Sequence, residues 1–144
     1  PFDIVHLASH SLFTGDPRSS FILTWDGKLD MDQLAQVLGA GRFRDAPIEL
    51  LVLSACETAA GDDRSALGLA GVAIKVGARS VVASLWPIAD EPSVTLVDGF
   101  YRHLLQPGLN RAEALRQAQL GLLADTRYRH PFYWAPFLLI GNWT

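Results

Sequence analysis

His10 and Cys56 are the two residues of this sequence whose chemistry and spacing most directly suggest catalysis. Each follows a short apolar run that is typical of a buried strand, residues 4–9 before His10 and residues 48–54 before Cys56. The chain between them is long enough for one crossover, which would make the strands neighbours and bring both residues to one edge of the sheet. A thiol beside an imidazole can act as a nucleophilic pair, because the thiolate attacks while the imidazole handles the proton.

Both residues also have a purely structural interpretation. Cys56 is the single cysteine of the chain, which excludes an internal disulfide and a CxxC metal site, and a lone cysteine is commonly a small buried hydrophobe. A single histidine such as His10 is more often a structural hydrogen-bonding residue than a catalyst. The spacing alone leaves both interpretations open.

The elements that must position these residues alternate between apolar strands and helices. Asp30 with Gln33, and Asn110 with Glu113, are typical of helix N-termini. An Asp-Gly pair predicts a hairpin with a primed turn over residues 21–29. Further strands are expected at residues 80–85 and 136–140, a polar loop at 57–65 and a helix at 66–76 closed by Gly77.

Three helical faces can be read from the spacing of apolar residues. Leu34, Val37 and Leu38 share one face of the first helix, and a helix broken by Pro107 and Gly108 has one face made of Val94, Val97, Tyr101, Leu104 and Leu105. For the helix that ends near Ala124 we expect a buried face made of Ala112, Leu115, Gln119 and Leu122.

Apolar strands separated by helices predict a mainly parallel sheet covered on both faces. The predicted fold is therefore a three-layer α/β/α architecture over residues 1–144, with ligands at the carboxyl ends of the strands. The chain starts at Pro1 without a methionine and enters a strand almost at once, as a piece of a longer protein would.

Composition excludes several classes of protein. A formal net charge of −3 without a run of like charge argues against a nucleic-acid partner. No apolar run is long enough to span a bilayer and no signal peptide is recognisable, so with its free thiol we expect a cytoplasmic protein. Neither glycine-rich phosphate-binding motif occurs, which leaves a nucleotide-binding domain without support.

The motifs around the two candidate residues resemble the CHAT family, caspase-like cysteine peptidases of the same clan as caspases, metacaspases and separase. The resemblance covers nearly the whole chain, at residues 5–10 (VHLASH), 53–58 (LSACET), 77–90, 100–102, 114–115 and 130–137. It implies the C-terminal catalytic portion of a caspase-like domain that lacks its N-terminal strands. It further implies a helical-repeat region elsewhere in the same protein, and a sheet edge through which this piece can self-associate.

By this resemblance Cys56 is the nucleophile and His10 the general base of a dyad that cleaves a protein or peptide substrate through a thioester. The backbone N–H groups of Ser11 and Cys56 would hold the oxyanion. Position 11 departs from the clan, which commonly has glycine there. No metal or cofactor is implied.

The loop after residues 80–85 is expected to line the primary substrate pocket. Trp86 could supply a flat apolar wall, and Asp90 or Glu91 could accept a basic side chain. The structural alternatives are a rigid strand end packed on the core for Trp86 and a helix N-cap for Asp90. His6 is expected to be a core or interface histidine.

Two functions from different classes follow. The first is a cysteine endopeptidase regulated by regions that precede residue 1. The second is a catalytically silent caspase-like interaction domain, which the serine at position 11 favours. The reactivity of Cys56, and its dependence on His10, distinguishes them.

Overall fold

The computed structural model describes residues 3–14, 16–39, 47–58, 71 and 75–144, and of Pro17 and residues 55–58 it describes the backbone alone. In chain order the elements are β1 (Ile4–Phe13), a short 3-10 helix (Pro17–Ser19), β2 (Phe21–Leu23), β3 (Lys28–Asp30), α1 (Met31–Gly39), β4 (Leu50–Thr58), β5 (Ser80–Ser84), α3 (Asp90–Leu104), α4 (Arg111–Ala124), α5 (Pro131–Trp134) and β6 (Phe137–Gly141).

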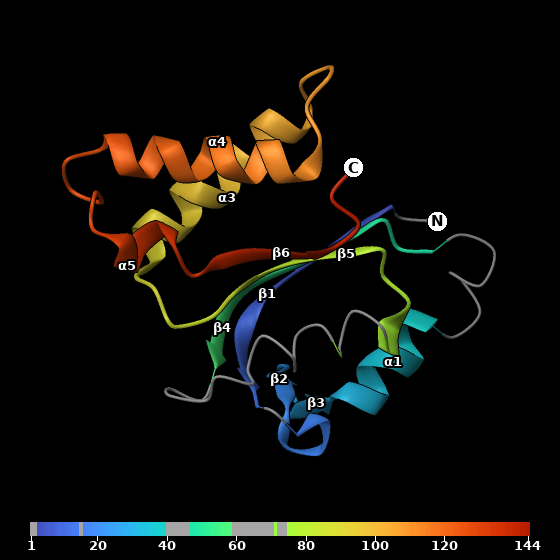
Figure 1. Ribbon diagram of the computed structural model, residues 1–144. Coiled ribbons are helices and arrows are strands. Elements are labelled where there is room, and N and C mark those ends of the chain that lie inside the picture. Colours follow the sequence, from blue (N-terminus) through green and yellow to red (C-terminus); the bar gives the residue numbers. More distant parts are fainter. Residues whose placement is uncertain (1–2, 15, 40–46, 59–70, 72–74) are drawn as a thin grey trace.

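Six strands form one sheet in the order β3-β2-β1-β4-β5-β6. The central strands β1, β4 and β5 are parallel, as the sequence predicts, and β2, β3 and β6 are each antiparallel to their neighbour. The direction of β6 follows from the helical hairpin of α3 and α4, which returns the chain to the carboxyl end of β5 (Figure 1). There the N–H of Leu85 donates to the carbonyl of Pro136 (3.0 Å), so β6 has to run back along β5.

Helices cover the sheet on both faces, which confirms the α/β architecture with three layers (Figure 1). On one face α1 packs on a core that includes Phe13, Leu34, Leu51 and Val81. On the other face α3, α4 and α5 pack on a second core. Its buried members are Leu50, Val52, Val82, Leu96, Phe100, Ala114, Leu115, Ala118, Leu122, Tyr128 and Phe137.

The predicted start of α1 is confirmed in detail. The carboxylate of Asp30 accepts from the N–H of Gln33 (2.8 Å), and the Gln33 amide oxygen accepts from the N–H of Asp30 (3.0 Å), which is a reciprocal capping box. Leu34 and Leu38 are buried, whereas Val37 is 63% exposed and lies off that face. The stop predicted at Gly41, most of the loop at 57–65 and most of the helix at 66–76 lie outside the described residues.

The predicted hairpin is present as β2 and β3, but its turn differs from the expected one. Leu23 pairs with Lys28, which leaves a four-residue connection in which the N–H of Thr24 donates to the carbonyl of Gly27 (2.8 Å). Gly27 is not among the glycines with positive φ, so the Asp-Gly pair does not form the predicted primed turn.

α4 begins and ends where the sequence predicts, with the Asn110 side chain accepting from the N–H of Glu113 (2.9 Å). Its buried face is rotated from the expected one and consists of Ala114, Leu115, Ala118 and Leu122. Gln119 is half-buried because its amide donates to the carbonyls of Trp134 (3.1 Å) and Phe137 (3.0 Å), which ties α4 to the start of β6.

Candidate functional site

The two candidate catalytic residues lie on adjacent parallel strands, as their spacing predicts. His10 is in β1 and Cys56 is in β4, and Ser11, the residue after His10, is the register partner of Cys56. The expectation that each residue follows the end of its strand is wrong. Both strands continue past these residues because β1 keeps pairing with β4 as far as Phe13, opposite Thr58.

The ladder between β1 and β4 is irregular at the candidate site. Ala8 pairs with Ser54 and Ser11 pairs with Cys56, so β1 contains one more residue than β4 between these two pairs. Such bulges turn a side chain out of the regular alternation and occur often beside active sites. Ser9 anchors the irregularity, since its hydroxyl donates to the carbonyl of Leu23 in β2 (2.6 Å), and the neighbouring His10 is exposed.

Ser11 is enclosed on both sides by strands. It pairs with Cys56 in β4 and with Ile22 in β2, and it is 5% exposed. Its hydroxyl has no hydrogen-bond partner among the described residues. The backbone N–H of Ser11 faces one of the two neighbouring strands, so the predicted oxyanion role requires a local opening of that ladder.

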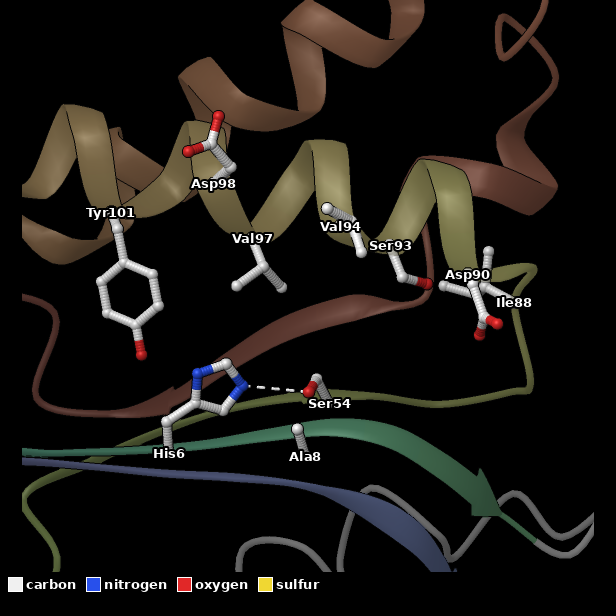
Figure 2. A pocket seen from close by; sticks show the side chains of 10 residues that line it. All are labelled: His6, Ala8, Ser54, Ile88, Asp90, Ser93, Val94, Val97, Asp98 and Tyr101. Carbon is white, nitrogen blue, oxygen red and sulfur yellow. Dashed lines mark hydrogen bonds between the residues drawn. The ribbon is translucent and has the colours of Figure 1, made fainter.

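A groove of about 640 Å³ lies between the sheet and α3. Its floor is made by His6 and Ala8 of β1 and Ser54 of β4, and Figure 2 shows Val94 and Val97 of α3 pointing toward that floor. The remaining lining residues are Ile88, Asp90, Ser93, Asp98 and Tyr101. Ser54 lies two residues before Cys56, so one end of the groove approaches the candidate nucleophile.

The inner end of the groove is polar. The Nε2 atom of His6 lies 2.9 Å from the Ser54 hydroxyl, and the His6 and Tyr101 rings lie 5.7 Å apart (Figure 2). Burial lowers the pKa of His6 below its usual value, because desolvation disfavours the charged imidazolium. Burial raises the pKa of Tyr101 for the same reason. Both side chains are therefore neutral at pH 7.

Of the predicted substrate-binding residues, only Asp90 lines the groove. Glu91 forms an ion pair with Arg127 (3.0 Å), and the Trp86 indole N–H donates to the carbonyl of Phe132 (3.0 Å). The N-cap interpretation of Asp90 is wrong, because α3 begins at Asp90 and its N-cap is Ala89, with no side-chain hydrogen bond.

The polar cluster of His6, Ser54 and Tyr101 was not recognised from the sequence. The sequence predicts a core or interface position for His6, and in the structure this side chain lines the groove beneath α3. The alternation of side chains along a strand could have identified this position. Val5 and Leu7 pack against the core beneath β1, so His6 between them points to the opposite face of the sheet.

Two further properties bear on function. Within the described part of the chain, no group of three or more His, Cys, Asp and Glu side chains could hold a metal ion. No described helix combines the length and apolar character needed to cross a membrane.

Comparison with known proteins points to one family. The model of the CHAT domain matches residues 1–142. The chain is 32% identical over 102 residues to tetratricopeptide repeat protein 28 of Homo sapiens, and 35% identical over 99 residues to the Mus musculus protein of the same name. These alignments cover 67% and 66% of this chain and 4% of each relative, so the chain matches a small part of much longer proteins.

Proposed function

Since this chain belongs to the CHAT domain family, we propose that it is a cysteine endopeptidase in which Cys56 and His10 form the catalytic dyad. The observation that carries the proposal is the register of the central sheet. Two residues with complementary chemistry, far apart in sequence, are on adjacent strands and one register step apart, beside the irregularity of the β1–β4 ladder, and His10 is exposed.

The proposed reaction needs only these two side chains, a peptide and water. His10 accepts the thiol proton, and the sulfur of Cys56 forms a bond to the scissile carbonyl carbon. The N–H group of Cys56, and that of Ser11 after a local opening of its ladder, hold the oxyanion, and the C–N bond then breaks as His10 protonates the leaving amine. Water attacks the thioester, gives its proton to His10, and releases the carboxylate product and the thiolate.

Asp90 supports a preference for a basic side chain in the substrate. It is exposed, lines the groove, and has no ion pair among the described residues, so its carboxylate can take an Arg or Lys group. Glu91 is less suited to this role because Arg127 already neutralises it. Trp86 is held by Phe132 and would act as a rigid support for the loop that leads to Asp90.

The names of the two relatives support a helical-repeat region as a partner of this domain. Both are tetratricopeptide repeat proteins, so we propose a helical-repeat region in the same protein that controls access to the dyad.

The dyad is tested by iodoacetamide alkylation of Cys56 as a function of pH, which is unambiguous because the chain has one cysteine. We expect an apparent pKa well below the free-thiol value of about 8.5. It should return toward that value in His10→Ala. His130→Asn is the matched control, since His130 caps α5 through a hydrogen bond from the N–H of Phe132 (3.2 Å) and asparagine retains an acceptor. A slow profile that His10→Ala does not change would refute the dyad.

The second candidate function, a silent interaction domain, is favoured by Ser11. Its burial between two strands is what an ordinary structural residue would show, and it stands where the clan commonly has glycine. A peptidyl acyloxymethyl ketone with arginine next to the reactive group separates the two functions. Covalent labelling of Cys56 supports the peptidase, and absence of labelling in a folded protein whose Cys56 still alkylates supports the silent domain.

A further inference from the structure

A side-chain hydrogen bond joins β1 to β4 on the α3 side of the sheet. The Nε2 atom of His6 lies 2.9 Å from the Ser54 hydroxyl (Figure 2). The register partner of His6 is Val52, so the imidazole reaches two residues further along β4, toward Cys56. The bond can form in either neutral tautomer, because Nε2 donates to the hydroxyl when it carries the proton and accepts from it when it does not.

The His6 ring is supported from the helical layer. Its centroid lies 5.7 Å from that of Tyr101, and the Tyr101 ring lies 5.5 Å from Phe100. Phe100 is 1% exposed, and Tyr101 packs against the same core. Contact with a helix that is anchored in the core therefore limits the positions that the imidazole can take. Functional groups are held most precisely when packing also fixes the residues that support them.

The bond lies directly before the irregularity of the β1–β4 ladder. The register is continuous as far as Ala8, opposite Ser54, and the next pair is Ser11 with Cys56. Ser54 is therefore the last residue of β4 that is paired regularly before Cys56. Backbone pairing restrains the chain less at such an irregularity. A side-chain bond at Ser54 supplies a restraint at the point where the ladder loses one.

We propose that His6 and Ser54 are positioning residues of the peptidase, whose hydrogen bond holds the segment of β4 that carries Cys56 in place against the strand that carries His10. The inference rests on the proposed function, since proton transfer and attack stay with His10 and Cys56. A misplacement of about 1 Å can cost about 100-fold in rate, so a smaller shift of this segment should still be measurable.

The test measures inactivation by the peptidyl acyloxymethyl ketone described above, over a range of inhibitor concentrations. The maximal inactivation rate depends on the geometry of the dyad, whereas the concentration that gives half of that rate reflects binding of the inhibitor. We expect Ser54→Ala to lower the maximal rate about tenfold and to leave the half-maximal concentration nearly unchanged. Alkylation by iodoacetamide should show the apparent pKa of Cys56 moved toward that of a free thiol.

Ser93→Ala is the matched control. Ser93 is a half-buried serine that lines the same groove, but it belongs to α3, and its hydroxyl donates to the carbonyl of Ala89 (3.0 Å). We expect this variant to keep the maximal rate and the pH profile of the unmodified protein. Circular dichroism verifies that each variant folds. A purely structural role of Ser54 would lower the urea midpoint without changing the pH profile of Cys56.

Conservative variants test the bond itself. Ser54→Thr keeps the hydroxyl and His6→Gln keeps an amide group near the position of Nε2, so both should retain most of the maximal rate. His6→Leu should lose as much as Ser54→Ala. The double variant should lose no more than either single variant, because both substitutions remove the same bond.

The outcomes separate this inference from the proposed function. If His10→Ala changes the alkylation of Cys56 but Ser54→Ala behaves like Ser93→Ala, the dyad stands and the positioning role is wrong. Additive losses in the double variant would also overturn that role, because the two residues would then not act as a pair. If His10→Ala changes nothing, there is no dyad to position and both proposals fail.

Discussion

Replacing Gly141 with alanine tests how the last strand is held against the sheet that carries the candidate site. Gly141 ends β6 with φ at +101°, opposite Ser80 of β5. A Cβ atom there would lie 2.3 Å from the carbonyl oxygen of Arg79. That oxygen cannot easily move, because it accepts a hydrogen bond from the N–H of Asn142 (2.8 Å).

The expected decrease in the free energy of unfolding can be estimated from these contacts. A non-glycine residue held at such a φ costs about 1–3 kcal/mol. Moving β6 to relieve the clash would also break the bond from Asn142 to Arg79 and the one from the Ser80 hydroxyl to the Asn142 carbonyl (2.5 Å). Each is worth about 1 kcal/mol net. We expect Gly141→Ala to lower the free energy of unfolding by about 3–5 kcal/mol. The midpoint of thermal unfolding should fall by roughly 10–15 °C.

The matched control is Gly108→Ala, measured with Gly141→Ala by urea and thermal unfolding. Gly108 is the third residue of a turn in which the N–H of Leu109 donates to the carbonyl of Gln106 (3.3 Å), and its φ is +85°. Apart from its two chain neighbours, none of the described residues has an atom within 4 Å of its Cβ position, so alanine there meets backbone strain without a clash. The difference between the variants isolates the contact with Arg79. If Gly141→Ala is no more destabilising than Gly108→Ala, the clash argument is wrong.

Three further predictions concern α4 and β1. Gly121→Ala should raise the free energy of unfolding by about 0.5–1 kcal/mol, because Gly121 is inside α4 with open space at its Cβ, and an unchanged urea midpoint would contradict this. Because the pKa of His6 is lowered in the folded protein, the unfolded chain binds more protons just below pH 6.5. The free energy of unfolding, measured by urea titration, should therefore fall as the pH decreases through that range. His6→Gln should make this decrease smaller. On the side away from β4, β1 pairs with β2 at Ser11 and Leu12, which leaves the edge of its first half unpaired among the described residues. We therefore expect sedimentation to show concentration-dependent self-association through this edge, and Ile4→Lys to reduce it. A wild-type protein that stays monomeric would exclude edge pairing.

Features set by neighbouring residues could be predicted from the sequence. The capping box of Asp30 and Gln33 and the cap at Asn110 depend on groups three residues apart, and both are present. The adjacency of the strands that carry His10 and Cys56 could also be predicted, because a crossover between parallel strands leaves few topologies.

Features that depend on residues far away in the sequence could not be predicted. β1 extends beyond residue 9 because β4 and β2 pair with its second half, and nothing in the local sequence marks that pairing. The spacing correctly groups Val94, Val97 and Tyr101 on one face of α3, but it does not identify the face that meets the core. The contact of α3 with α4 determines which face meets the core. Ala118 of α4 lies close to Gly99 of α3, since a Cβ atom added to Gly99 would lie 3.5 Å from the Ala118 Cβ. The groove is the consequence, and it could not be seen before the helices were placed.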